Sequence, residues 1–206
     1  MIYAVTLISC GNNGNKILTG QKAHQSHKDT IILEASNNEA DSIVNDYLTD
    51  QLTPIRQNFK RINSITHWTK IIKKDFNEST EGGEANFYYS NGGLEKIVTR
   101  NFGETSQQLS EFYLLNGQLS FVFEKKCNYN RPIYYDSVAM KENEDTEVFD
   151  LKKSEFIEDR SYFEKGKLIH QLNNQDCGSP FSDDYLSKEQ MRITTDFGKL
   201  LKHDVK

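Results

Sequence analysis

The sequence has little of what marks several protein classes. It contains three prolines, three cysteines and one tryptophan in 206 residues, and its formal net charge is -5. No apolar run approaches the roughly 20 residues of a transmembrane helix. Nucleic-acid-binding domains carry a basic patch or stripe, which this acidic chain does not have. We therefore expect neither a membrane-spanning helix nor a nucleic-acid partner.

Motifs that carry chemistry are also scarce. The stretch Glu81-Gly82-Gly83-Glu84 lacks the lysine of a phosphate-binding loop. His24 and His27 have a spacing that suits a metal on a helix, but no third ligand lies nearby in the sequence. The chain has 30 Asp and Glu residues, so pairs of acids occur by chance and do not identify a hydrolase. We predict no catalytic residue, no metal and no cofactor.

The length and composition favour one folded domain with short appendages. Hydrophobic residues make up 36% of the chain and aromatic residues 11%, which is enough for a packed core. We divide the chain into a targeting segment at residues 1–10, a flexible tether at residues 11–35 and a single α+β domain at residues 36–206.

The first ten residues predict export. An uncharged, mostly apolar run precedes Cys10, and a polar stretch rich in glycine and asparagine follows it. Leu7-Ile8-Ser9-Cys10 resembles the lipobox of bacterial lipoproteins, in which the cysteine becomes the lipid-modified N-terminus. No basic residue precedes Lys16, so we expect the natural start to lie further upstream. The resemblance implies a lipid anchor on Cys10 and a location in the cell envelope, outer-membrane or periplasmic.

An alternative reading of the same segment stays open. Residues 1–9 also suit a first β-strand of a cytoplasmic protein in which Cys10 is a buried thiol. If the chain is exported, Cys127 and Cys177 enter an oxidising compartment in which a disulfide persists. They are a candidate pair, and two unpaired thiols are the alternative.

Helices are predicted at both ends of the domain. Ser36-Asn37-Asn38-Glu39 reads as a capping box, and apolar residues then recur at helical spacing up to Leu52. Pro54 is expected to break this helix, with a second helical piece at about residues 54–63. Near the C-terminus an amphipathic helix is predicted, capped by Ser182 or Ser187. Its apolar stripe consists of Leu186, Ile193, Phe197, Leu200 and Leu201.

Three stretches of the middle region align without a gap. Each begins with two aromatic or large apolar residues, continues with a two-residue turn that ends in glycine, and closes with a leucine. Asn-Gly between such runs is a strong hairpin signal, because both residues accept positive φ. We predict three β-hairpins, at residues 87–94, 112–119 and 161–168.

The spacing of the repeats suggests more strands. Tyr88 and Tyr113 lie 25 positions apart and Tyr162 lies 49 further on, so residues 137–149 are read as a degenerate fourth hairpin with an acidic loop. Leu119, Phe121 and Phe123 are expected to face one way, by simple strand alternation. The predicted fold is α+β, an antiparallel meander of about six to eight strands with N-terminal helices and a C-terminal helix.

Equivalent hairpin positions place Tyr88, Tyr113 and Tyr162 in one row across the predicted sheet. Arg100 and Arg160, with Arg131, supply cations near it. Tyrosine and arginine dominate interface energetics, so the row is a candidate surface for a sugar or a partner chain. The alternative is that these aromatic residues belong to the core.

The hairpin repeats resemble the MORN-like repeats of some bacterial toxin-immunity proteins and other exported repeat modules. This resemblance implies binding or scaffolding rather than catalysis. The leading hypothesis is therefore a lipid-anchored, non-enzymatic binding protein of the cell envelope, with a protein or an envelope glycan as its partner. One alternative is an immunity or inhibitor protein with an acidic patch at Glu142, Glu144, Asp145 and Glu147. Another is a carboxylate-based hydrolase with a concave, acid-lined pocket.

Overall fold

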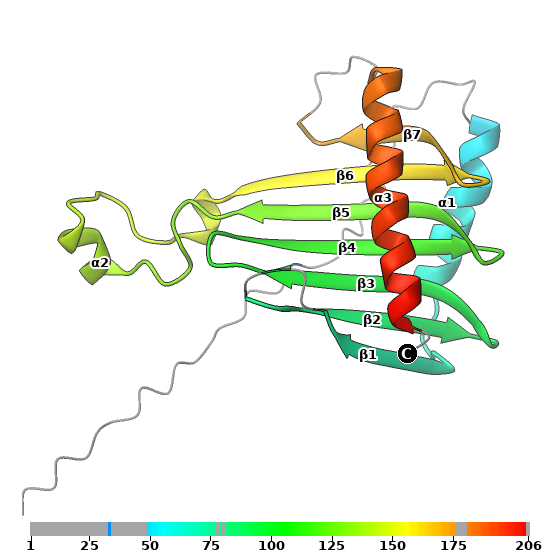
Figure 1. The fold of residues 1–206 in the computed structure, drawn as a ribbon, viewed down its shortest axis with the longest axis horizontal. Coiled ribbons are helices and arrows are strands. Elements are labelled where there is room, and N and C mark those ends of the chain that lie inside the picture. The colour runs from blue at the N-terminus through cyan, green and yellow to red at the C-terminus, as the bar shows by residue number, and fades with distance from the viewer. Residues whose placement is uncertain (1–32, 34–48, 77–78, 80, 176–180, 205–206) are drawn as a thin grey trace, which may run out of the picture. The chain divides into compact units, whose positions relative to one another are not determined.

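A computed structural model describes residues 33, 49–76, 79, 81–175 and 181–204. They form a seven-stranded antiparallel sheet in which each strand pairs with the next along the chain, from β1 to β7. One long helix lies on each face of the sheet (Figure 1). The elements are α1 (Thr49–Asn63), β1 (Lys70–Asp75), β2 (Gly83–Ser90), β3 (Gly93–Phe102), β4 (Ser106–Leu115), β5 (Gln118–Asn128), α2 (Ser137–Glu142), η2 (Leu151–Lys153), β6 (Glu155–Glu164), β7 (Lys167–Asn173) and α3 (Asp183–Asp204).

The predicted fold class is confirmed, and so are the three hairpins. Strands β2 and β3, β4 and β5, and β6 and β7 each turn through two residues. Both turn residues have positive φ in every hairpin, between 49° and 81°, as a primed turn requires. The turn pairs are Asn91-Gly92, Asn116-Gly117 and Lys165-Gly166.

Each hairpin also carries a β-bulge at the same place. The pairing register shifts just after Tyr88, Tyr113 and Tyr162, so the returning strand has one extra residue. A bulge sends the residues on its two sides to opposite faces, because side chains alternate along a strand. The extra residues are Glu95, Ser120 and Ile169.

The bulges separate the two apolar clusters. Tyr113 and Tyr162 lie in the cluster beneath α1 with Leu52, Ile55 and Ile62 of that helix. The leucine of each hairpin lies instead in or against the cluster beneath α3, which includes Ile193 and Leu200. Those leucines are Leu94, Leu119 and Leu168.

Simple alternation therefore gave the wrong face for one residue of β5. Leu119 belongs to the α3 cluster, whereas Phe121 and Phe123 belong to the α1 cluster. The cause is the bulge at Ser120, which inserts one residue between them. Both faces of the sheet are apolar beneath a helix, and each helix buries one of them.

Two further expectations were wrong. Helix α1 runs through Pro54 without a break. The proline has no N–H to donate to the carbonyl of Asp50, but Asp50 is exposed and lies in the first turn of the helix. Residues 137–149 form no fourth hairpin. Asp136 caps the short helix α2 there by accepting hydrogen bonds from the amides of Val138 and Ala139, so the backbone leaves the strand conformation.

The C-terminal helix is confirmed as α3. Ser182 caps it by accepting a hydrogen bond from the Tyr185 amide at 3.3 Å. Ile193 and Leu200 are fully buried, but Leu201 is 36% exposed and lies beside the predicted stripe rather than in it. The C-terminal end is held over β1 and β2, where Lys74 and Tyr89 hydrogen-bond to Asp204.

The third hairpin offers a test of turn chemistry. Lys165 has φ of 49°, which is unfavourable for a residue other than glycine, asparagine or aspartate. Replacing Lys165 with asparagine reproduces the other two turns, and we expect it to raise the free energy of unfolding by about 0.5–1 kcal/mol. Urea denaturation measures this, with Lys165→Ala as the control that should give no gain. Equal stabilisation by both variants would contradict the turn argument.

Candidate functional site

Cross-strand pairing gathers polar side chains on one part of the sheet face that α3 covers. Thr99 of β3 pairs with Ser110 of β4, and Ser110 pairs with Glu124 of β5. In the next row Asn101 pairs with Gln108. The row on the other side, nearer the hairpin turns, is apolar and consists of Phe87, Ile97, Phe112 and Val122.

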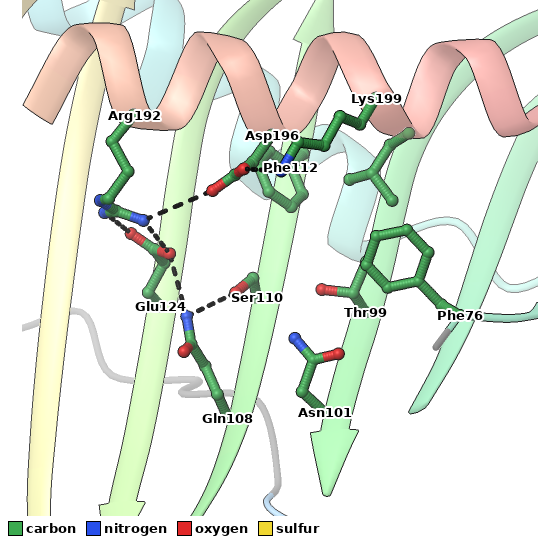
Figure 2. Close-up of a pocket in the computed structure, with 11 residues that line it drawn as sticks. Phe76, Thr99, Asn101, Gln108, Ser110, Phe112, Glu124, Arg192, Asp196 and Lys199 are labelled. Atoms are coloured by element: carbon green, nitrogen blue, oxygen red, sulfur yellow. Dashed lines mark hydrogen bonds and ion pairs between the residues drawn. The ribbon is translucent and has the colours of Figure 1, made fainter. Parts of the chain in front are cut away.

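These polar residues line a cavity of about 160 Å³ between the sheet and α3 (Figure 2). The helix contributes Arg192, Asp196 and Lys199, whose side chains point down toward the strands. Phe76 and Phe112 form an apolar wall. The cavity therefore combines hydroxyl, amide and charged groups with aromatic carbon.

A chain of hydrogen bonds fixes one side of the cavity. Arg192 donates to both carboxylate oxygens of Glu124, at 3.0 and 2.5 Å, and also to Glu189. Gln108 Nε2 donates to Glu124 Oε1 and to Ser110 Oγ, each at 3.2 Å. Burial lowers the pKa of Arg192, but the bonds to the two glutamates outweigh it, so the pKa is raised overall. Arg192 stays charged and holds Glu124 in place.

The other two charged groups pair with each other. Lys199 Nζ lies 3.2 Å from an Asp196 oxygen, and the second Asp196 oxygen is 4.0 Å from Arg192. Both carboxylates of the cavity, Glu124 and Asp196, are thus engaged by cations. A general acid needs a carboxyl group kept neutral by burial, so this arrangement does not favour the hydrolase alternative. Among the described residues no group of three or more metal-ligating side chains is found.

A second feature is the long connection between β5 and β6. We call residues 130–150 the β5–β6 arm; it extends past the end of the sheet, away from α1 and α3 (Figure 1). Asn130 closes its base by accepting from the Asp150 amide and donating to the Val148 carbonyl. Arg131 crosses the arm to bind Asp145 with two hydrogen bonds, at 2.6 and 2.9 Å. Those bonds hold the pKa of Asp145 well below its usual value.

The arm is closed by contacts within itself and tied to the β3–β4 turn, and it adds no buried residue to the core. None of its residues is buried, and its aromatic and aliphatic side chains include Tyr134 and Val138, each 58% exposed. Of the predicted acidic patch, Asp145 is paired with Arg131 and Glu147 with Lys153. The other two members, Glu142 and Glu144, are exposed, and among the described residues neither has an ion-pair partner.

The structure brings the three predicted tyrosines into one row, but beneath α1. Tyr113 and Tyr162 are each 1% exposed, and Phe59 of α1 packs on Tyr113 with ring centroids 4.9 Å apart. Tyr88 is partly buried against Trp68. The row is therefore part of the core, because the apolar face of α1 packs on it. It offers no exposed platform for stacking.

A polar network terminates this row. The Tyr113 hydroxyl donates to Glu111 and lies within hydrogen-bond distance of Asn63 and Lys96, while Lys96 forms an ion pair with Glu111 at 2.7 Å. Burial, followed by the nearby Glu111 charge, raises the pKa of Tyr113 well above its usual range. The phenol stays protonated, and the network anchors the end of α1 on the sheet.

The predicted arginines serve separate places. Arg100 lies 3.3 Å from Glu84, and Arg160 forms an ion pair with Glu158 while lying over the ring of Phe123. Arg131 belongs to the β5–β6 arm. Arg100 and Arg160 lie on the same face of the sheet as the tyrosines, and the charge of Arg100 acts on Tyr88, whereas Arg131 lies apart from them in the arm.

Several predicted residues lie outside the described part of the chain. These are the lipobox with Cys10, the tether with His24 and His27, the capping box at Ser36 and one cysteine of the candidate pair, Cys177. Cys127 is fully buried, and burial raises the pKa of its thiol. The predicted disulfide stays a prediction. Among the described residues no helix is both long and apolar enough to span a membrane.

Comparisons of the chain with protein-family models, with curated proteins and with solved structures found no match.

Sequence reasoning missed the cavity. Its strand residues Thr99, Ser110 and Glu124 are spread along the chain, and only the register of β3, β4 and β5 brings them together. The sequence did contain a signal for it. Ser110 and Glu124 lie two residues from Phe112 and Val122, so each polar residue is on the same face of its strand as an apolar one. Polar residues at inward positions of a hairpin predict a polar site or a cavity.

The ion pair beneath α3 can be tested by its effect on stability. Arg192→Ala leaves Glu124, which is 7% exposed, without its cation. Because the Arg192 side chain is 40% exposed, we expect a loss of about 1–2 kcal/mol of unfolding free energy, less than for a fully buried pair. Urea denaturation measures it, and Lys188→Ala, which breaks the exposed pair with Asp184, should cost only about 0–0.5 kcal/mol. Similar losses for the two variants would show that the pair does not hold α3.

Proposed function

We propose that the chain is a non-enzymatic, lipid-anchored binding protein of the bacterial cell envelope that engages a partner protein through the β5–β6 arm. The anchor rests on the likeness of residues 7–10 to a lipobox. The engagement of a partner rests on one observation, which is the self-contained arm with its exposed apolar side chains.

The construction of the arm supports this function. Connections longer than about 12–15 residues are uncommon in compact domains and are usually functional or disordered. The arm is such a connection, ordered and with only the short helix α2 in it. Tyr134 and Val138 are each 58% exposed on a segment that contributes no buried residue. Exposed aromatic residues held on a rigid support lose little conformational entropy on binding, which favours a protein interface.

The charges of the arm indicate what kind of surface it meets. Glu142 and Glu144 are exposed beside the apolar residues, and complementary charge speeds association and excludes wrong partners. A basic protein surface with an apolar recess is the matching partner. The same observation favours a second candidate function, an immunity or inhibitor protein that binds a basic toxin or lytic enzyme one to one.

The edges of the sheet are less suited to binding. Edge strand β1 carries Lys70, Lys73 and Lys74, and lysines on an edge oppose the addition of another strand. On the other edge, Gln190 of α3 accepts a hydrogen bond from the Leu168 amide of β7 at 2.9 Å. Strand β1 is therefore unsuited to strand addition, and one amide of β7 is already engaged, which favours the arm as the binding surface.

Site-specific photo-crosslinking tests the role of the arm. A photoreactive residue at position 138 should form one discrete protein adduct in cells, because the arm is in contact with its partner. The same residue at Met191, which is 71% exposed on α3, is the matched control and should not form that adduct. Added soluble wild-type protein should compete, and the variant Tyr134→Ser/Val138→Ser should not. Equal adducts from both positions, or equal competition by both proteins, would contradict the proposal.

Membrane fractionation tests the anchor separately. Expressed in a bacterial host with its upstream coding sequence, the wild-type chain should fractionate with membranes, and mass spectrometry should find a lipid-modified Cys10 at its N-terminus. Cys10→Ser should be soluble, because it has no thiol to acylate, whereas Cys177→Ser should stay on the membrane. If wild type and Cys10→Ser are both soluble and retain Met1, the chain is not a lipoprotein, and the crosslinking test of the arm stands apart from that result.

A further inference from the structure

One residue that lines the cavity beneath α3 has a buried polar atom without a partner among the described residues. Asn101 Oδ1 is buried beside Gly83 and accepts no hydrogen bond from a described residue. Thr99, which is 3% exposed, lines the same cavity with its hydroxyl-bearing side chain. A buried polar group without a partner costs about 1–3 kcal/mol, so an occupant that supplies donors and acceptors would stabilise the site.

The positive and negative side chains that line the cavity are equal in number, which favours a neutral occupant. Among the described residues that line the cavity, the carboxylates of Glu124 and Asp196 form ion pairs with the cations Arg192 and Lys199. An anion or a cation entering the cavity would have to compete with one of these pairs. A neutral molecule would not.

The remaining groups select a hydroxylated molecule. Thr99 and Ser110 offer hydroxyls and Asn101 and Gln108 offer amides, and all of these both donate and accept. Figure 2 shows the amide of Asn101 pointing from the sheet toward α3, with Phe76 on the opposite side of the space from Arg192. Aromatic carbon on one side and planar polar groups on the other suit a ring that has both C–H and O–H faces.

We propose that this cavity binds a neutral, polyhydroxylated small molecule of the size of one sugar ring. Its volume of about 160 Å³ is below the roughly 300–1,000 Å³ of sites for drug-sized ligands, so a single ring fills it. This site goes beyond the partner-binding role of the arm, and it involves different residues.

An outer cleft adjoins the cavity and shares two of its walls. Asn101 and Gln108 line both spaces, and the cleft continues along the β3–β4 turn past Glu104, Thr105 and Lys126. The cleft encloses about 410 Å³ and is more open than the cavity. In this proposal the cleft takes up a substituent that projects from the bound ring past Asn101 and Gln108.

Nuclear magnetic resonance titration of the full chain tests the proposal. Glucose, galactose, N-acetylglucosamine and myo-inositol are each added up to about 10 mM, ten times a millimolar Kd. At least one should shift the side-chain amide signals of Asn101 and Gln108 saturably. Sodium sulfate and sodium acetate at the same concentration should not shift them.

Two variants locate the binding. Thr99→Val keeps the shape of the side chain and removes its hydroxyl, and Asn101→Ala removes the amide. Each should weaken binding about tenfold, as expected for the loss of one hydrogen bond. Gln118→Ala, an exposed residue at the start of β5, is the control and should bind like wild type. The arm variant Tyr134→Ser/Val138→Ser should also bind normally, which separates this proposal from the proposed function.

Three results would overturn the proposal. The first is that no neutral probe shifts the two amides, in which case the cavity holds only water. The second is that sulfate or acetate binds in preference. The third is that Thr99→Val and Asn101→Ala bind a neutral probe as well as wild type does, while correctly folded spectra show that both variants are intact.

Discussion

The turn-and-bulge geometry of the three hairpins determines how the rest of the molecule packs. A two-residue turn with positive φ at both positions requires glycine at its second position, and all three hairpins have it. The bulge that follows inserts one residue into the returning strand, which reverses the faces to which the side chains beyond it point. As a result, each hairpin puts its tyrosine toward α1 and its leucine toward α3.

The bulges also provide the surface on which α1 docks. Asn58 of α1 donates to the Leu114 carbonyl at 2.9 Å and lies 3.4 Å from the bulge residue Ser120. Arg61 binds the bulge residue Glu95 at 2.5 Å. A bulge leaves backbone groups free that a regular strand pair would use in its own hydrogen bonds. A polar helix residue packed on the bulge can therefore hydrogen-bond to these groups.

Much of the fold was predictable from the sequence because its signals are local. Asn-Gly flanked by apolar residues predicts a hairpin without knowledge of anything distant, and the C-terminal stripe predicts α3 in the same way. The face of Leu119 was not predictable by alternation, because a bulge leaves no composition signal of its own. The arm was misread because an acidic stretch suits a hairpin loop as well as a capped helix. Its structure depends on the ion pair between Arg131 and Asp145, and no local sequence pattern predicts that these two residues pair.

The outer cleft and the arm are neighbours, since both contact the β3–β4 turn. Ile133 of the arm donates its amide to the Glu104 carbonyl at 2.8 Å, and the amide of Tyr129, just before the arm, donates to the Thr105 carbonyl at 2.9 Å. Glu104 and Thr105 also line the outer cleft. Contiguity alone does not couple two sites, because coupling requires an element with two arrangements that both ligands bias. The arm is closed by bonds of its own, at Asn130 and at Arg131, and its ties to the turn are backbone hydrogen bonds that a change of side chain at Tyr134 or Val138 leaves in place. The same turn that brings the two surfaces together therefore lets each be altered without the other.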